Sequence, residues 1–429
     1  MAVTTDPAAL LTPQGEELLG RLAAEQSDAA ASSLALAERL RREYPAGLVA
    51  AAMAQQELRR AAEAKFSRAA EMLFTRAGYE QSSSEAIASY RAGRLWNAAH
   101  LADLCCGIGG DLIALAGSSK VLAVDRDETH ARLALHNAAV YGRADHVAAV
   151  VSDVRDVPLA GIDAVFIDPA RRSGPGTASA ATGSPGPARR YKPGTSEPPL
   201  DWCTALAEQV AAVCIKAAPG LPEELIPPGW EAEFIAESRD LKEAVLWSPA
   251  LATAPSAGLQ GILGPRRATV LAMAPADSAL RSYTLVASEG DPVALREPGE
   301  YLLDPNPAVT RAGLVEDLAR NLGADAAKID PQIAFLTLDR SVKTPFARTL
   351  RVQHSAPWNE KQFAKRLREL GIGAVDIRRR GLAGDVDQIR RRLKLEGKTR
   401  ATLAITRVNN RPWGLICTED APPVDVPLV

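Results

Sequence analysis

The stretch Leu101-Ala-Asp-Leu-Cys-Cys-Gly-Ile-Gly-Gly-Asp-Leu112 decides the fold, because it predicts a buried strand, a glycine-rich turn and the start of a helix. Gly107, Gly109 and Gly110 let the backbone pass close to a ligand, since a Cβ at these positions would collide with it. The helix that follows begins with free N–H groups. This turn suits a nucleotide-like cofactor, although a purely structural turn has the same glycines.

Short apolar runs alternate with helical patterns around this stretch, which predicts an α/β fold with a doubly wound parallel sheet. Ligands of such sheets bind outside the carboxyl ends of the strands, so we expect the site at that edge. The first helices are expected at Asp111–Ala116 and Glu128–Tyr141. The predicted strands are His100–Leu104, Lys120–Asp125, Val147–Ser152, Ala164–Ile167, Ala212–Lys216, Ala232–Glu237 and Ala268–Met273.

The chain is expected to have four parts. Residues 1–98 predict a helical region, 99–275 the sheet domain, 276–300 a proline-containing linker and 301–420 a smaller α+β domain. Within the sheet domain, residues 171–199 are rich in Gly, Pro and Ser and predict a flexible loop. The helices of the last part are expected at Ala308–Leu322, Glu360–Leu370 and Val386–Leu393. Its strands are expected at Ile333–Thr337, Ala347–Gln353, Ala374–Arg379, Thr402–Val408 and Trp413–Cys417.

Composition narrows the class of protein. The 429 residues are 47% apolar and 24% charged, the profile of a globular protein. No apolar run reaches the roughly 20 residues of a membrane span and no secretory signal is recognisable, so no membrane partner is expected. The five cysteines show neither a Cys-x-x-Cys pair nor metal-ligand spacing, which favours the cytoplasm and no bound metal. Residues Asp339 to Arg411 carry 19 Lys+Arg and 7 Asp+Glu, a net charge of +12. Since the whole chain has a net charge of −2, the rest of it carries −14.

Aspartates end several of the predicted strands. Asp125 lies 22 residues after Asp103, where a carboxylate can accept the hydroxyls of a ribose. Asp153 follows the third strand, placed to meet an adenine amino group, and Asp168 follows the fourth. Leu112 stands where the nicotinamide fingerprint has its third glycine, and the P-loop Gly-Lys-Ser/Thr is absent. A carboxylate at Asp103 repels a pyrophosphate but suits a cofactor that carries an ammonium and a sulfonium.

With these motifs, residues of about 70–275 resemble the class I S-adenosylmethionine (SAM)-dependent methyltransferases. The resemblance implies that the chain is a methyltransferase with SAM as its cofactor. It also implies that Asp103 and the glycines hold the methionine part, Asp125 the ribose and Asp153 the adenine. The cofactor-binding residues expected in this way are Asp103, Cys105, Gly107, Gly109, Gly110, Asp125, Arg126, Asp153, Val154 and Asp168.

The acceptor side is expected at Phe166-Ile-Asp-Pro-Ala-Arg-Arg172, which stands where amino-directed methyltransferases have Asp/Asn-Pro-Pro-aromatic. In that family pattern the acid side chain and a backbone carbonyl accept hydrogen bonds from the amino group. Ala170 and Arg171 depart from the pattern, and an arginine here can stack on a base or hold a phosphate. No cysteine has the surroundings of a pyrimidine C5 nucleophile, which favours an N- or O-acceptor. The expected catalytic residues are Asp168, Pro169 and Arg171, and the expected substrate-binding residues are Arg172 and Lys216.

Residues of about 300–420 resemble the THUMP-like domain of some bacterial and archaeal methyltransferases. THUMP domains are associated with RNA-modifying enzymes, so the resemblance implies RNA as a partner. Arg378, Arg379 and Arg380 are dense enough for phosphate contacts, and Trp358 and Trp413 are either stacking platforms or core residues. The stretches that carry the resemblance are Asp304-Pro-Asn-Pro-Ala-Val-Thr-Arg-Ala-Gly313, Trp358-Asn-Glu-Lys361, Ile377-Arg-Arg-Arg-Gly381 and Thr406-Arg407.

Three hypotheses about function remain open on the sequence. The first is a SAM-dependent methyltransferase that acts on a base nitrogen of structured RNA, either tRNA or rRNA. The second is a methyltransferase for a protein or a small molecule, with the basic domain used for assembly. The third is a SAM-sensing RNA-binding protein without turnover. Nothing in the sequence indicates the oligomeric state.

Overall fold

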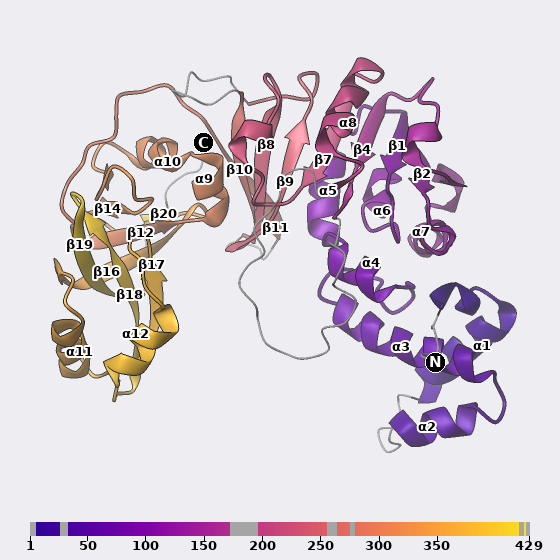
Figure 1. Cartoon of the computed structure of the whole chain (residues 1–429), viewed down its shortest axis with the longest axis horizontal. Helices are drawn as coiled ribbons and strands as arrows, with labels where there is room; N and C mark the ends of the chain where they lie inside the picture. The colour runs from indigo at the N-terminus through magenta and orange to yellow at the C-terminus, as the bar shows by residue number, and fades with distance from the viewer. Residues whose placement is uncertain are drawn as a thin grey trace. The chain divides into compact units, whose positions relative to one another are not determined.

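The chain forms two compact units, seen in a computed structural model (Figure 1). One unit comprises Met1–Leu225 with Val245–Ala252, and the other Ile226–Ala244 with Thr253–Val429. This grouping differs from the four predicted parts, which remain predictions. The structure describes residues 6–25, 33–171, 196–254, 264–274, 279–419 and 424–425.

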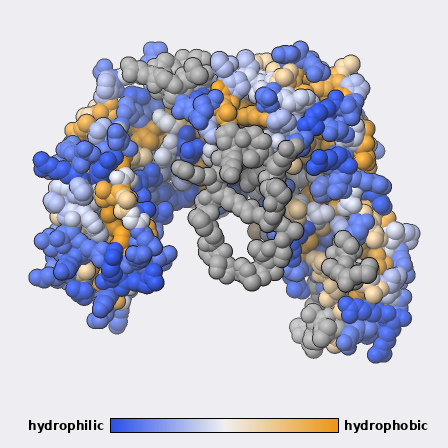
Figure 2. All heavy atoms as spheres, in the orientation of Figure 1, coloured by the Kyte–Doolittle hydropathy of each residue, from blue (hydrophilic) through white to orange (hydrophobic). Residues whose placement is uncertain are grey.

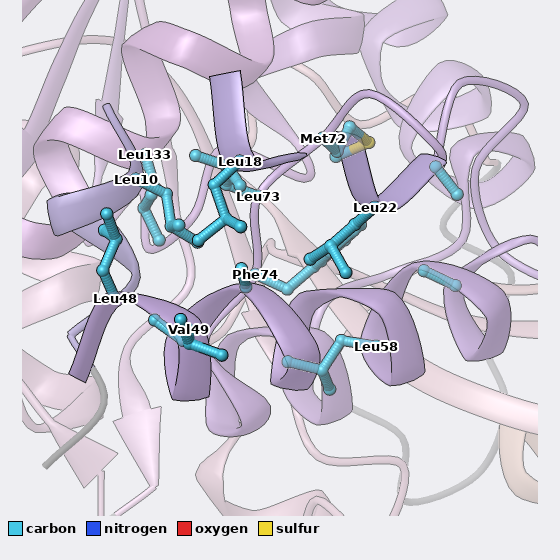
Figure 3. Close-up of a cluster of buried hydrophobic side chains, with 14 of the residues drawn as sticks. Leu10, Leu18, Leu22, Leu48, Val49, Leu58, Met72, Leu73, Phe74 and Leu133 are labelled. Atoms are coloured by element: carbon cyan, nitrogen blue, oxygen red, sulfur yellow. The ribbon is translucent and has the colours of Figure 1, made fainter. Parts of the chain in front are cut away.

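Helices occupy the beginning of the first unit. They are η1 (Pro7–Leu10), α1 (Pro13–Glu25), α2 (Ser33–Leu40), α3 (Ala46–Ala62), α4 (Arg76–Gln81) and α5 (Glu85–Arg94). Their apolar residues share a core with α7 (Glu128–Val140), where Leu133 lies beside Leu10 and near Leu18 and Leu73 (Figure 3). The helical region is therefore packed onto the sheet domain through α7.

The long sheet has the strand order β11-β10-β8-β9-β7-β4-β1-β2-β3. Its strands are β1 (His100–Leu104), β2 (Lys120–Asp125), β3 (Val147–Val151), β4 (Ala164–Ile167), β7 (Ala212–Ala217), β8 (Glu231–Glu237), β9 (Asp240–Trp247), β10 (Arg266–Met273) and β11 (Leu280–Val286). Strands β3, β2, β1, β4 and β7 pair in parallel, which confirms the predicted doubly wound α/β class. By residue number, strands β8, β10 and β11 of this sheet belong to the second unit. The other elements of the first unit are α6 (Leu112–Leu115), η2 (Ala144–His146), η3 (Val154–Asp156), β5 (Ala170–Arg171), β6 (Ser196–Glu197), α8 (Leu200–Ala205), η4 (Leu206–Glu208) and η5 (Glu223–Leu225).

Two strands of this sheet are not predicted by the sequence. Strand β9 begins with Asp240-Leu-Lys-Glu, whose charges hide the apolar half that follows. Only Ser238 and Arg239 join it to β8, without the Gly or Asn typical of a two-residue hairpin, and Ser238 takes a φ of 54°. Strand β11 is mostly exposed, so its apolar alternation is weak, and it lies inside the stretch predicted as a linker.

The second unit contains a seven-stranded sheet with the order β13-β14-β12-β16-β19-β18-β17. Its strands are β12 (Tyr301–Pro305), β13 (Ala327–Lys328), β14 (Leu336–Leu338), β16 (Ala347–Pro357), β17 (Ile372–Arg379), β18 (Thr399–Val408) and β19 (Arg411–Thr418), and a separate pair joins β15 (Val342–Lys343) to β20 (Val424–Asp425). Its helices are α9 (Pro307–Ala312), α10 (Val315–Leu322), α11 (Glu360–Glu369) and α12 (Val386–Leu393).

The second unit corrects one predicted helix and shows where its two tryptophans pack. The single helix predicted over Ala308–Leu322 is wrong, because Gly313 adopts a left-handed φ of 76° and ends α9 before α10 begins. Trp358 and Trp413 are partly buried and pack against the apolar cores of this unit. Their role as stacking platforms stays a prediction.

Candidate cofactor and acceptor site

The carboxyl ends of the central strands lie side by side in the first unit. Leu104 of β1 is level with Val124 of β2 and with Ile167 of β4. Asp103 lies one residue before this level, and Asp125 and Asp168 lie one residue after Val124 and Ile167. The parallel pairing therefore brings the three aspartates to one edge of the sheet.

Asp103 is a buried acid at the cofactor edge. It is fully buried, and neither of its carboxylate oxygens has a hydrogen-bond partner among the described residues. Burial raises the pKa of Asp103 well above its usual range, and the neighbouring Asp111, Asp168 and Asp125 raise it further. Leaving a buried carboxylate unpaired costs free energy that a bound cation would recover. The ammonium and sulfonium of SAM supply this charge, so the residue fits the cofactor.

The glycine turn has one position that faces open space. Gly107 adopts a left-handed φ of 55°, and a Cβ there would meet no protein atom within 4 Å. At Gly109 a Cβ would lie 3.0 Å from the Ala134 backbone of α7, and at Gly110 it would lie 3.1 Å from the Ser82 hydroxyl. A Cβ at Gly109 or Gly110 would therefore press on the protein itself, whereas Gly107 is the glycine with room for a ligand.

Asp125 is oriented by three neighbours. Its Oδ2 accepts the Gly107 N–H at 2.9 Å, its Oδ1 accepts the Asp127 N–H at 2.9 Å, and His130 Nδ1 lies 3.7 Å from Oδ1. Burial opposes ionisation, but His130 and the two N–H groups lower the pKa of Asp125 below its ordinary value. Because each carboxylate oxygen has two lone pairs, the ionised Asp125 can still accept ribose hydroxyls. The sequence does not single out His130, which lies in the first turn of α7.

A network of ion pairs links Lys216 to the acceptor side. Lys216 Nζ donates to Asp168 Oδ2 at 2.7 Å and lies 3.9 Å from Asp111 Oδ2. Arg91 of α5 is buried and forms an ion pair with the other oxygen of Asp111. The sequence predicts Lys216 as a substrate ligand, and the structure places it against the predicted catalytic acid. Sequence reasoning misses Arg91 and Asp111, since a helical arginine and a helix-start aspartate are usually solvated.

The acceptor motif is described only in part. Pro169 is buried, and Ala170 with Arg171 forms β5, which pairs with β6. Among the described residues, Oδ1 of Asp168 has no hydrogen-bond partner, whereas Oδ2 is held by Lys216. The side chain of Arg171, the whole of Arg172 and the rest of the predicted loop up to residue 195 lie outside the described residues.

Asp153, the residue expected to meet the adenine, forms a helix-cap hydrogen bond and a local ion pair. Asp153 caps η3, where its Oδ1 accepts the Arg155 N–H at 3.0 Å and its Oδ2 pairs with the Arg155 guanidinium at 3.1 Å. Val154 is buried. Arg126 and Cys105 flank the same edge, and Cys105 takes a left-handed φ of 63° that is unusual for a non-glycine residue. The cofactor roles of these residues remain predictions.

The helical region braces the cofactor turn. The buried Asn137 of α7 donates from Nδ2 to the carbonyls of Leu73 and Ile108 at 2.9 and 2.8 Å, and its Oδ1 accepts the Leu73 N–H at 2.8 Å. In α4, a Cβ at Gly78 would lie 2.5 Å from Ile108, so this helix packs directly on the turn. The segment before β1 therefore fixes the shape of the cofactor turn.

The predicted RNA contacts lie in the second unit and differ in their surroundings. Arg380 donates to Asp304 at 2.8 Å, and Arg378 donates to Asp376 at 3.0 Å. Nη1 of Arg379 is buried without a partner among the described residues. The three arginines therefore do not form one uniform surface.

Three family models match parts of the chain. Residues 98–181 match the family described as RNA cap guanine-N2 methyltransferase, and residues 347–419 match the family described as THUMP domain-like. Residues 4–62 match a domain of unknown function. The first match covers the cofactor turn and the acceptor motif.

Curated relatives and a solved structure match most of the chain. Two relatives, from Mycobacterium tuberculosis strains CDC 1551 / Oshkosh and ATCC 25618 / H37Rv, carry the description "uncharacterized S-adenosylmethionine-dependent methyltransferase". The chain is 33% identical to each over 354 residues, which is 78% of this chain and 85% of the relative. The crystal structure of a "putative methyltransferase from Porphyromonas gingivalis W83" is 20% identical, with a TM-score of 0.71 over 95% of this chain and 99% of that chain.

The fold, the cofactor edge and the curated relatives together define a class I SAM-dependent methyltransferase. The chain belongs to the family of S-adenosylmethionine-dependent methyltransferases represented by the two Mycobacterium tuberculosis relatives, and SAM is its cofactor. Its second unit carries a THUMP-like domain. No helix in the described part of the chain is long and apolar enough to cross a membrane.

Proposed function

We propose that this methyltransferase modifies a base nitrogen of structured RNA, tRNA or rRNA, in the cytoplasm. The observation that carries the proposal is Asp168, which follows β4 at the cofactor edge with Oδ2 held by Lys216 and Oδ1 without a partner among the described residues. A free carboxylate oxygen can accept a hydrogen bond from an amino group. The match to the RNA cap guanine-N2 methyltransferase family supports an amino acceptor, and the THUMP domain-like match supports RNA.

The residues at this edge have separate tasks in the proposed reaction. SAM supplies the methyl group from its sulfonium, and Asp103, Gly107 and Asp125 are the residues that would hold it. Oδ1 of Asp168 accepts a hydrogen bond from the acceptor N–H, which turns the nitrogen lone pair toward the methyl group. Lys216 fixes the orientation of Asp168 through its contact with Oδ2. Oδ1 of Asp168 can then accept the proton that the nitrogen releases.

A carbon acceptor on a pyrimidine ring is not favoured by the cysteines. Attack on such a ring requires a thiolate. Burial raises the pKa of Cys203 and of Cys417 to about 12, so neither thiol ionises near neutral pH. Burial also raises the pKa of Cys105, which is the half-buried cysteine at the cofactor edge. These thiols therefore support a nitrogen acceptor over a carbon acceptor.

Transfer of tritium from labelled SAM tests this function. The purified full chain is incubated with RNA, protein and small-molecule fractions from a strain that lacks it. We expect label in the RNA fraction, no label in RNA from the parent strain and none with Asp168→Asn. Label confined to the protein or small-molecule fraction would refute the RNA substrate, and no label in any fraction would refute turnover.

A further inference from the structure

Four arginines of the second unit gather around one buried aspartate. Asp304 is 2% exposed, and its carboxylate accepts from Arg380 Nη2 at 2.8 Å and from Arg239 Nη2 at 3.2 Å. Arg378 Nε lies 3.9 Å from the same carboxylate, and Arg348 is level with Asp304 on the neighbouring strand β16. These residues come from the β8–β9 turn, β12, β16 and the end of β17, so the fold brings them together.

The arginines are held in place by other contacts of the same unit. Arg239 follows Ser238, whose carbonyl accepts from Asn306 Nδ2 at 2.7 Å. Asn306 is fully buried and also caps α9, so the turn that carries Arg239 is anchored. The guanidinium of Arg380 lies over the Phe335 ring, 5.0 Å from its centroid. A preorganised guanidinium loses less entropy when it binds a ligand.

Most of the N–H donors in this cluster have no acceptor among the described residues. A guanidinium has five N–H donors. Among the described residues, Arg239 pairs through Nη2 and Arg378 through Nε. Their side chains are 37% and 43% exposed, so the remaining N–H groups can reach solvent. The arginines can therefore donate hydrogen bonds to a further acceptor without breaking their contacts with Asp304.

The cluster also carries an excess of positive charge. Among the described residues, the carboxylates that pair with the four arginines are Asp304, Asp376 and Glu419. Burial lowers the pKa of Arg239, and its three arginine neighbours lower it further against the effect of Asp304. Since four cations face three anions, an added anion would relieve the mutual repulsion.

We propose that Arg239, Arg348, Arg378 and Arg380 form a binding site for backbone phosphates of the RNA substrate, with Asp304 as the residue that positions them. This inference rests on the proposed function and gives the RNA a defined contact site. One guanidinium group can bind a phosphate through two parallel N–H···O bonds. The hydrophilic surface over α11 and α12 (Figure 2) has no comparable buried acid among its described ion pairs.

Salt-dependent binding tests the site. Fluorescently labelled bulk tRNA and rRNA fragments are titrated with the full chain between roughly 50 and 300 mM salt. Arg239→Gln and Arg378→Gln each leave three of the four arginines around Asp304. Each should weaken RNA binding by about 3- to 10-fold and reduce the slope of log K against log salt by about one. Arg378→Lys keeps the positive charge but loses the forked N–H donors of the guanidinium. Its RNA affinity should lie between those of wild type and Arg378→Gln.

Arg340→Gln is the matched control, since Arg340 is a half-exposed arginine of the same unit that pairs with one acid, Asp325. It should bind RNA as the wild type does. All variants should keep the wild-type affinity for SAM and the wild-type melting temperature. If wild type binds RNA and both glutamine variants behave as the control, the phosphate site is refuted and the proposed function stands. If wild type binds no RNA even at the lowest salt, the proposed function is refuted.

Discussion

Replacing Asp103 by Asn should lower the affinity for SAM but raise the stability of the SAM-free protein. The carboxylate is fully buried and unpaired among the described residues, and burial with three nearby acids raises its pKa. A group whose pKa is raised on folding stabilises the folded state below its unfolded pKa of about 4. That contribution is lost as the pH rises through the folded pKa, so an ionised Asp103 destabilises the protein at alkaline pH.

Asn has the same shape as Asp and no charge. We expect Asp103→Asn to raise the free energy of unfolding without SAM by about 1–3 kcal/mol at pH 8, and by less at pH 5. For a unit of this size the melting temperature should rise by roughly 2–10 °C. The affinity for SAM should fall about 10- to 100-fold, because a charge-assisted contact is lost.

Calorimetric unfolding with and without SAM, together with titration calorimetry of SAM, measures both effects. An unchanged dissociation constant for SAM would show that Asp103 does not bind the cofactor. A lower melting temperature at pH 8 without SAM would show that the carboxylate is stabilised by a partner. Either result would refute the assignment of Asp103.

Three other substitutions test the rest of the site. Lys216→Met should lower kcat about 10- to 100-fold, because Asp168 loses a charge-assisted hydrogen bond, while SAM affinity stays within about twofold; an unchanged kcat in steady-state methyl transfer would contradict this role. Asn137→Ala leaves backbone groups of Leu73 and Ile108 unpaired, so denaturant unfolding should show a loss of about 2–4 kcal/mol and KM for SAM should rise; an unchanged KM would limit Asn137 to a structural role. Asp125 raises the pKa of His130, so the contribution of the protonated ring is complete below about pH 6.5 and is lost as the pH rises through the raised pKa. The difference in unfolding free energy between wild type and His130→Gln should therefore shrink from pH 6 to pH 9, and a difference independent of pH would rule out the ion pair.

The central strands were predictable because their apolar runs are short and end in polar residues. Strands β1, β2 and β4 have the predicted bounds, and the aspartates at their ends lie at one edge as parallel pairing requires. Strand β9 was not predictable, since three of its first four residues are charged and its pairing with β7 is non-local. The break at Gly313 was hidden because the apolar spacing continues across it.

The candidate site was predictable only for residues whose chemistry alone suggests their ligand, and not for residues whose role depends on the neighbours that the fold gives them. An acid at Asp103 indicates a cationic ligand, whereas Arg91 and Asp111 acquire their partners from separate segments. His130 reaches Asp125 across the short β2–α7 connection, which the sequence pattern does not single out. Gly109 looks like a ligand-facing glycine in the sequence, whereas in the structure a Cβ there would press on the backbone of α7. The Asp304 cluster likewise joins residues from 239 to 380, which no local pattern connects.

Comparison of modified nucleosides tests the central proposal most directly. RNA from a strain that lacks this protein and from its parent is digested and analysed by mass spectrometry. The proposal predicts that one base-methylated nucleoside is absent from the deletion strain, returns with the wild-type gene and does not return with Asp168→Asn. Identical nucleoside profiles in the two strains would contradict RNA as the substrate.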